Sequence, residues 1–279
     1  MLLVAKPAGP TSHDVVDVVR RALDTSRVGH LGTLDPFAEG LLVLVVGRAT
    51  RLAPFAAGWT KSYEGVIRLG VVTTTDDCTG ETVRVSEAWR ECDRATVAAV
   101  LARFHGTMAQ VPPAHSAVHV DGVRAYRRAR RGEAVTLAAR SVEIAELTLE
   151  GFAGADVRFR ATVGSGTYLR ALARDVGEAL GCGAHLAALT RTAVGPFRLV
   201  QAKPPDMVTG ADLHPAGLLV SDLPSRSLAG DERDAVVHGR SVPAASDADR
   251  VALFASDGEL VAVGEREGDV LRPRVVVAD

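Results

Sequence analysis

The stretch VGHLGTLDPFAEGLL, residues Val28–Leu42, leads directly into the apolar run LLVLVV, residues Leu41–Val46. Its glycines and its Asp-Pro step are typical of turns, whereas Leu41–Val46 has the length and composition of a buried strand. Asp35 is therefore expected on a tight loop that enters the core. An Asp-Pro step is most often structural, so a function for Asp35 must be supported by the rest of the chain.

Composition and length indicate a globular protein. Of the 279 residues, 47% are hydrophobic and 24% are charged, which suffices for a sizeable core and a second, smaller domain. The longest apolar run, Leu41–Val46, is far shorter than the roughly 20 residues of a membrane span. Lys6 and Pro7 come too early for a signal peptide. We therefore expect a cytoplasmic protein that does not enter a membrane.

The cysteines and histidines show no metal-binding pattern. Cys78, Cys92 and Cys182 form neither an even set nor a Cys-x-x-Cys pair, which disfavours a disulfide framework and a thiolate zinc site. The eight histidines do not pair closely with carboxylates at ligand spacing. We expect no metal.

Charge is unevenly distributed along the chain. Residues 231–279 contain six Arg and eleven Asp or Glu, a net charge of −5, and the remaining residues carry a net charge of +3. Within the body, RAYRRARRG concentrates arginine around Tyr126, at positions Arg124, Arg127, Arg128, Arg130 and Arg131. This density suits the neutralisation of phosphates, although a solvated helix face is an equally good reading of an isolated arginine run.

Periodicity predicts a mixture of helices and strands. Thr11 and Asp14 resemble a capping box that opens the helix SHDVVDVVRRAL. SYEGVIRLG and VRFRATV alternate between apolar and polar residues, as strands with one wet face do. Further elements are expected as a strand at Leu2–Ala5 and helices at Arg94–Phe104 and Tyr168–Leu180, the last ending at Gly181.

The pattern loosens from Gln201 to Gly230, where Pro, Gly, Ser and Asp are frequent. We expect the domain boundary here, with one domain over residues 1–224 and a second over residues 225–279. The second segment contains the short apolar runs VALFA, ELVAVG and RPRVVVA, separated by polar turns. These predict a small β-barrel.

Five blocks of the sequence resemble the TruB family, the bacterial tRNA pseudouridine-55 synthases, in order and spacing. They are LLVAKPAGPTSHDVV, VGHLGTLDPFAEGLL, SYEGVIRLGVVTTTDDCTGE, QVPPAHSAVHVDGVRAYRRAR and GSGTYLRALARDVG. The resemblance extends from Leu2 to Phe197. It implies an α/β (α+β) catalytic domain with a mixed, largely antiparallel sheet, a thumb-like RNA-binding insertion at about residues 112–135, and a C-terminal PUA-like domain. It also implies cofactor-free isomerisation of a uridine in the T loop of transfer RNA.

That reaction needs a nucleophile, because the uracil must be cut from its ribose at N1, turned, and rejoined through C5. A carboxylate with a reference pKa of about 3.9 is ionised at neutral pH unless burial raises it, and an adjacent guanidinium counters such a rise. The resemblance makes Asp35 the nucleophile and Arg170 its partner. Arg170 also falls in the first turn of a predicted helix, where the helix dipole disfavours a cation, so we expect an anionic neighbour.

All three tyrosines, Tyr63, Tyr126 and Tyr168, fall within these blocks, which suggests rings that stack on bases. By resemblance, Tyr63 stacks on the target uracil and is a candidate base for the C5 proton, and Tyr168 lines the same pocket. A phenol with a pKa of about 10 is a poor base in water. Leu189 matches an apolar pocket residue of the family, and its alternative role is that of a plain core leucine.

A stacked uridine must be extruded before it can react. The resemblance assigns His30 to the space that the base leaves in the loop, with a capping or core histidine as the alternative. It assigns Lys6 to bracing the catalytic loop. The arginine-rich block, including Arg124, Tyr126, Arg127 and Arg128, is expected to hold the backbone of the T arm.

The chain departs from the family pattern at four positions. Ala5 stands where an acidic residue is usual, His115 and His119 stand where Tyr and Lys are common, and Thr74 replaces a second Asp. These changes bear on RNA contact and on loop packing around the site. None of them involves the nucleophile.

We therefore expect a tRNA pseudouridine(55) synthase that flips its target base, acts as a monomer and needs no guide RNA. One alternative is the catalytic subunit of a guide-RNA-dependent synthase, although such proteins generally have basic extensions in place of an acidic end. The other is a noncatalytic RNA-binding or RNA-folding module. The joint presence of Asp35, Tyr63 and Arg170 disfavours this second alternative.

Overall fold

The computed structural model describes residues 1–116, 119–120, 123–125, 128, 131, 133 and 137–278. Its main feature is a large mixed sheet in the order β1-β3-β12-β4-β11-β10-β7, with β2 paired to β3 and β13 paired to β12. The contact between β3 and β12 is parallel, and the other pairings are antiparallel. The strands are β1 Leu2–Lys6, β2 Val28–His30, β3 Glu39–Val46, β4 Lys61–Leu69, β7 Gly106–Gln110, β10 Arg140–Ala153, β11 Asp156–Val163, β12 Ala184–Val194 and β13 Phe197–Arg198. The expected α/β fold with a mixed sheet is confirmed.

Strands β1 and β3 are buried on both faces. Alternate residues of β3, such as Leu42 and Leu44, pack against helix α1 (Ser12–Ala22), whereas Leu41 and Val43 face η1 (Gly47–Ala56). A strand that is covered on both sides needs apolar residues throughout, which explains the unbroken LLVLVV. Helix α1 begins with the predicted capping box between Thr11 and Asp14.

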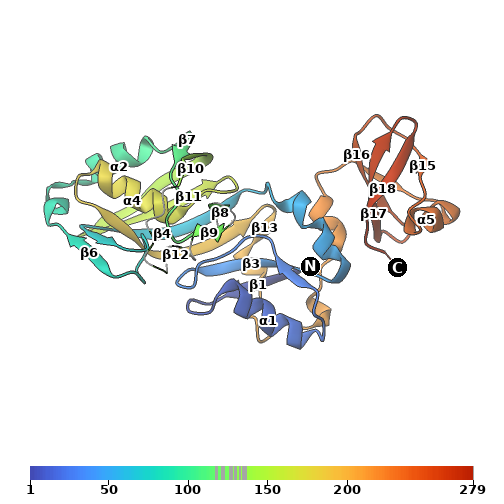
Figure 1. Cartoon of the computed structure of the whole chain (residues 1–279), viewed down its shortest axis with the longest axis horizontal. Helices are drawn as coiled ribbons and strands as arrows, with labels where there is room; N and C mark the ends of the chain where they lie inside the picture. Colours follow the sequence, from blue (N-terminus) through green and yellow to red (C-terminus); the bar gives the residue numbers. More distant parts are fainter. Residues whose placement is uncertain are drawn as a thin grey trace.

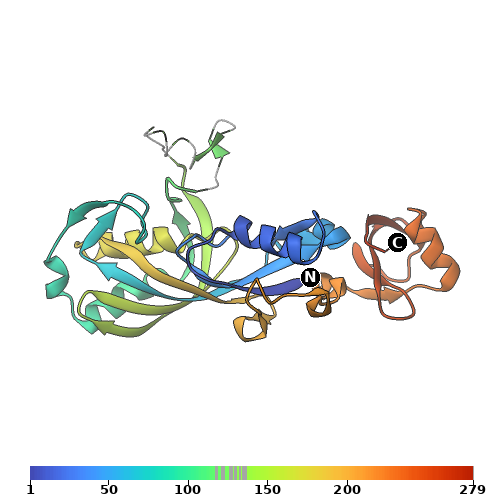
Figure 2. The same ribbon diagram turned by 90° about the horizontal axis from the view of Figure 1, so that it is seen from below.

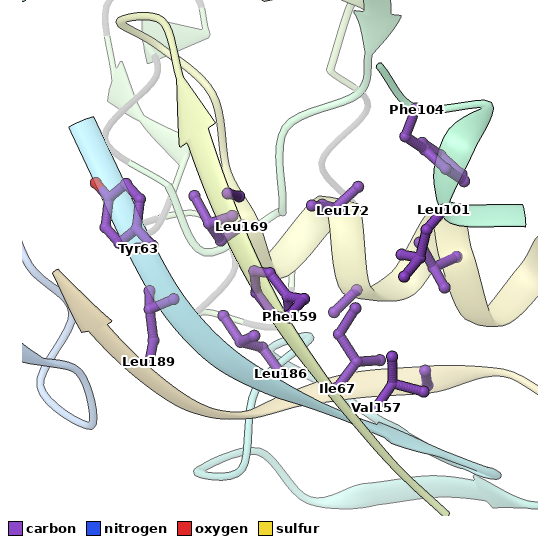
Figure 3. Close-up of a cluster of buried hydrophobic side chains, with 14 of the residues drawn as sticks. Tyr63, Ile67, Leu101, Phe104, Val157, Phe159, Leu169, Leu172, Leu186 and Leu189 are labelled. Carbon is purple, nitrogen blue, oxygen red and sulfur yellow. The ribbon is translucent and has the colours of Figure 1, made fainter. Parts of the chain in front are cut away.

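Strands β4 and β11 have one covered face, as their alternation predicts. Residues such as Ile67 and Phe159 point into a core that also includes side chains of α2 (Arg94–Ala102) and α4 (Leu169–Ala179) (Figure 3). Tyr63 and Leu189 lie at one end of this cluster. The core thus extends up to the residues expected at the active site.

Shorter elements surround this core. Strands β5 (Val71–Thr73) and β6 (Thr82–Val85) form one hairpin, and β8 (His119–Val120) and β9 (Val123–Arg124) form another. Figure 2 shows β8 and β9 standing out from the layer that the large sheet forms. The remaining single turns are η2 Ala88–Glu91, η3 Leu199–Gln201, η4 Gly210–Asp212 and η5 Ala216–Val220.

A second sheet lies at one end of the elongated molecule (Figure 1). Its strand order is β14-β16-β17-β18-β15. The elements are β14 Ser225–Ser227, α5 Gly230–Val237, β15 Val242–Pro243, β16 Arg250–Phe254, β17 Leu260–Glu267 and β18 Val270–Val276. The runs VALFA, ELVAVG and RPRVVVA therefore form strands, as predicted from their composition.

The loosely patterned segment after Gln201 packs on the large sheet. The backbone N–H of Ala5 in β1 donates to the carbonyl of Lys203, and the N–H of His214 donates to the carbonyl of Met1, each at 2.8 Å. Leu219 and Leu260 share an apolar cluster with Leu41 of β3, so the two sheets are joined through a common core. No helix in the described part of the chain is long and apolar enough to cross a membrane.

Candidate active site

Asp35 and Arg170 form a two-pronged ion pair. Arg170 Nε donates to Oδ2 of Asp35 at 2.9 Å, and Nη2 donates to Oδ1 at 3.2 Å. Arg170 lies in the first turn of α4, where the helix dipole alone would disfavour its charge. The Asp35 side chain is 36% exposed, whereas that of Arg170 is 6% exposed. A buried guanidinium thus holds a carboxylate that remains open to a ligand.

Arg170 also has further contacts that fix its position. Nη1 donates to the carbonyl of Thr75 at 3.0 Å, and Nη2 donates to the carbonyl of His115 at 2.9 Å. A second carboxylate, Asp77, lies with Oδ2 3.6 Å from Nε, and its side chain is 6% exposed. The buried guanidinium of Arg170 is therefore paired with two carboxylates.

Asp77 was not identified from the sequence. Its Oδ1 accepts hydrogen bonds from the Thr75 hydroxyl at 2.7 Å and from the backbone N–H and hydroxyl of Thr79 at 2.9 and 2.6 Å. This pattern resembles an ordinary Asx turn, which is how an Asp among threonines is normally interpreted. The sequence pointed to this hairpin only through Thr74, which stands where the family usually has a second Asp. The Thr74 hydroxyl accepts from the N–H of Glu81 within the same hairpin.

A cavity of about 220 Å³ opens beside Asp35. Asp35, Tyr63, Tyr168, Arg170 and Leu189 all line it, so five of the predicted site residues converge there. Tyr63 and Leu189 come from the neighbouring strands β4 and β12, and the Tyr63 hydroxyl points away from the other labelled side chains (Figure 3). An aromatic ring and an aliphatic side chain beside a carboxylate can hold a planar base against a nucleophile.

His115 also lines this cavity, and its backbone carbonyl is one of the acceptors of Arg170. The residue at the position where the family commonly has tyrosine thus lines the same cavity as Asp35. The side chain of His119, the other histidine of this segment, lies outside the described residues.

Lys6 contacts the loop that carries Asp35. Its buried ammonium donates to the carbonyls of Pro7, Pro36 and Ala38 at 2.9, 3.3 and 2.6 Å. Burial lowers the pKa of Lys6, and the negative charge of Asp35 raises it. Lys6 therefore joins β1 to the short segment between Asp35 and the start of β3.

Arg191 holds the other side of the loop and was not identified from the sequence. Its guanidinium, which is 1% exposed, donates to the carbonyls of Leu41, Thr33 and Gly32 at 2.7, 3.3 and 3.0 Å. The strand that carries Arg191 passes so close to Gly40 that a Cβ there would lie 2.3 Å from the Arg191 carbonyl oxygen. Gly40 also has a φ of +109°, so both space and conformation require glycine.

Gln110, at the end of β7, fixes the start of α4. Its side-chain amide donates to the carbonyl of Tyr168 at 3.2 Å and accepts from the Tyr168 N–H at 2.9 Å. Arg174, one turn after Arg170, donates to the carbonyl of Val111 at 2.9 Å. The base of the segment that begins near residue 112 is thereby attached to the helix that positions Arg170.

His30 is half-buried beside the same loop, where its Nδ1 accepts from the Gly32 N–H at 3.4 Å. Burial lowers the pKa of His30, and the charge of Arg191 lowers it further. The ring is therefore held in its neutral form near pH 7. It lines a second cavity, which shares Tyr63 and Tyr168 with the first.

The arginine-rich block is described only in part. Tyr126 and Arg127 lie outside the described residues, and so does the side chain of Arg124. Arg128 donates from Nε to Glu133 at 2.9 Å. No group of three His, Cys, Asp or Glu that could hold a metal ion occurs among the residues that the structure describes.

The sequence matches known family models. The model of the TruB family pseudouridylate synthase N-terminal domain matches residues 20–169, and that of the tRNA pseudouridylate synthase B C-terminal domain matches residues 170–228. The tRNA pseudouridine synthase B of Thermobifida fusca (strain YX) is 46% identical, and the alignment covers 100% of this chain and 98% of that protein. The protein of that name from Synechococcus sp. (strain CC9311) is 42% identical, with 99% and 96% covered.

Solved structures show the same architecture. A chain of a Cbf5-Nop10-Gar1 complex superimposes with a TM-score of 0.71 at 26% identity, covering 99% of this chain and 84% of that one. A chain of an H/ACA RNP bound to a substrate RNA containing 2′-deoxyuridine gives a TM-score of 0.73 at 24% identity, covering 100% and 84%. The two family models and the full-length relatives show that the chain belongs to the TruB family of pseudouridylate synthases.

Proposed function

We propose that the protein is an isomerase that converts a uridine of transfer RNA, at position 55 in the T loop, into pseudouridine. The observation that carries this proposal is the exposed Asp35 carboxylate, which the buried Arg170 holds at a cavity lined by Tyr63 and Leu189. Full-length relatives named tRNA pseudouridine synthase B support transfer RNA as the substrate.

In this reaction Asp35 acts as the nucleophile toward the extruded nucleotide. Arg170 orients the carboxylate, while each oxygen retains a lone pair for attack. The N1–C1′ bond breaks and the C5–C1′ bond forms, while the transient bond between Asp35 and the nucleotide forms and breaks again, so that the carboxylate is regenerated. Over the whole reaction, C5 loses a proton and N1 gains one. Tyr63 stacks on the uracil and is the candidate base for the C5 proton, with Tyr168 and Leu189 completing the pocket. Atoms and charge balance without any cofactor.

The surrounding residues prepare this step. Lys6 and Arg191 fix the carbonyls on either side of Asp35, so the carboxylate is preorganised rather than ordered by the substrate. His30 occupies the space that the flipped base leaves in the loop. Extrusion of the base costs a few kcal/mol in lost stacking. Contacts with the rest of the T arm offset this cost.

We assign residues 1–224 to the catalytic domain and residues 225–279 to a PUA-like domain, with an RNA-binding insertion at about residues 112–135. The net charge of −5 after Gly230 leaves the arginine-rich block as the main contact for T-arm phosphates.

Replacing Arg127 and Arg128 together by Ala is expected to lower the salt slope of log affinity by about 0.7–0.9 for each phosphate that the variant no longer neutralises. Titration at several salt concentrations measures this slope.

Tritium release from transfer RNA labelled at uridine C5 tests the activity. Purified protein without any guide RNA is expected to release one equivalent of tritium, and a transfer RNA with cytidine at position 55 is the matched control. Release that requires an added guide RNA would instead support a guide-dependent subunit. Binding of transfer RNA without release would support a noncatalytic RNA-binding or RNA-folding protein. Sedimentation of the active protein tests the expected monomer.

A further inference from the structure

A second cavity, of about 530 Å³, adjoins the cavity at Asp35. The two cavities share the lining residues Thr33, Tyr63, Thr167 and Tyr168. An RNA strand whose extruded nucleotide lies at Asp35 can therefore continue into the second cavity. The bond changes proposed above take place at Asp35, which lines the first cavity.

The charged groups that line the second cavity are all basic. They are Lys61 and Arg191, with the neutral ring of His30 beside them, and no aspartate or glutamate is among the described residues that line the cavity. Burial lowers the pKa of Lys61, and the charge of Arg191 lowers it further. An unoccupied cavity of this kind is electrostatically unfavourable, and an anion relieves that cost.

Lys61 and Arg191 lie close to each other beside Gly32. A Cβ built on Gly32 would lie 3.2 Å from Cε of Lys61 and 3.6 Å from Nη1 of Arg191. In the described part of the chain, Lys61 donates to the carbonyl of Trp59 at 2.9 Å, and Arg191 donates only to carbonyls. Neither therefore has a carboxylate to balance its charge, in contrast to Arg170.

Another part of the cavity lining is suited to an oxyanion. The turn from Ser165 to Thr167 lines it and contributes two hydroxyl-bearing side chains. Gly166, with a φ of +85°, brings the backbone close to the cavity without a side chain. Hydroxyls and exposed backbone of this kind commonly contact phosphate oxygens.

We propose that this second cavity binds one backbone phosphate of the RNA, immediately next to the extruded uridine, and that Lys61 is its main counter-charge. This inference rests on the proposed function, because it places the RNA strand relative to Asp35. A phosphate is favoured over a base because the cavity presents cations and donors without a carboxylate. Arg191 contributes mainly its charge, since three of its five guanidinium N–H groups already donate to carbonyls.

The chain offers a matched control for Lys61. It contains three lysines, Lys6, Lys61 and Lys203, against 29 arginines. Lys203 is 55% exposed and pairs with Asp212 near β1, away from the cavity. Lys61→Met and Lys203→Met are therefore the same chemical change, made inside and outside the proposed phosphate site.

The first measurement is the dissociation constant of each variant for a T-arm RNA over a range of salt concentrations. Lys61→Met is expected to weaken binding by roughly tenfold to a hundredfold, the range for losing one charge-assisted hydrogen bond. It is also expected to lower the salt slope by about 0.7, the value for one single-stranded phosphate. Lys203→Met should bind as the wild type does, and thermal unfolding shows whether both variants are folded.

The second measurement identifies the phosphate. Two T-arm RNAs are made in which a neutral methylphosphonate replaces the phosphate on either the 5′ or the 3′ side of the target, next to a 2′-deoxy sugar. The controls are RNAs that contain the same 2′-deoxy sugar and an ordinary phosphodiester. The neutral linkage at the correct side should weaken binding to the wild type but have little further effect on Lys61→Met.

Additive losses at both linkages, or equal binding by the Lys61 and Lys203 variants, would overturn the phosphate site. Pseudouridine formation by the wild type is measured in the same preparations. If the wild type forms pseudouridine while these binding results fail, only the phosphate site is wrong. If the wild type neither forms pseudouridine nor binds the T arm, the proposed function itself is wrong.

Discussion

Arg170 binds both oxygens of Asp35 across 135 positions of sequence, and a second carboxylate, that of Asp77, lies 3.6 Å from the same Nε. The three residues come from a loop, a hairpin and the first turn of a helix. Because Arg170 is buried and Asp35 is open, the guanidinium can orient the carboxylate without blocking it.

Arg170→Lys should slow pseudouridine formation by about 10- to 100-fold, since one charge-assisted hydrogen bond contributes about 1.5–3 kcal/mol. An ammonium cannot reproduce the two-pronged contact of a guanidinium. Single-turnover kinetics at saturating RNA measure the rate. A rate within twofold of the wild type would show that Arg170 does not orient Asp35.

Asp77→Asn should also slow the reaction, by roughly tenfold for a lost interaction of about 1.4 kcal/mol. An amide directs its NH2 group either at Arg170 or at the donors from Thr75 and Thr79, and both arrangements misplace the guanidinium. Asp175→Asn is the matched control, because Asp175 pairs with Arg174 in the same helix at 2.8 Å. Equal effects of the two variants would argue against a specific role for Asp77.

His30 should make the folded state sensitive to acid. Its pKa is lower in the folded state than the reference value of about 6.5. Between that lowered pKa and 6.5, the unfolded chain binds more protons, so the free energy of unfolding falls as the pH falls. His30→Gln should reduce this loss of stability below pH 6.5.

Urea unfolding of both proteins at several pH values between 7.5 and about 5 measures the effect. Parallel pH profiles for the wild type and His30→Gln would contradict the assignment of a buried, neutral imidazole.

Much of the site could be predicted from local patterns. The strand at Leu41–Val46, the capping box of α1 and the alternation in β4 and β11 each depend on neighbouring residues, and each is confirmed. The first-turn position of Arg170 even predicted an anionic neighbour, and the structure places Asp35 and Asp77 there.

Other features could not be predicted because they depend on long-range pairing. Strands β10 and β12 each have two irregularities in register, which interrupt the alternation that identifies a strand. Arg191 lies on β12 and reaches the catalytic loop only through the parallel contact of β12 with β3. Nothing next to Arg191 in the sequence indicates that its partners are the carbonyls of residues 32, 33 and 41.

The most direct test of the central claim is Asp35→Asn in the single-turnover tritium-release assay. The amide keeps the size of the side chain but is a far weaker nucleophile, and most of the affinity comes from phosphate contacts elsewhere. We predict no release above the level explained by trace deamidation, with transfer RNA still bound at near wild-type affinity. Sustained release by a variant shown by mass spectrometry to contain only asparagine at this position would contradict the role of Asp35 as the nucleophile.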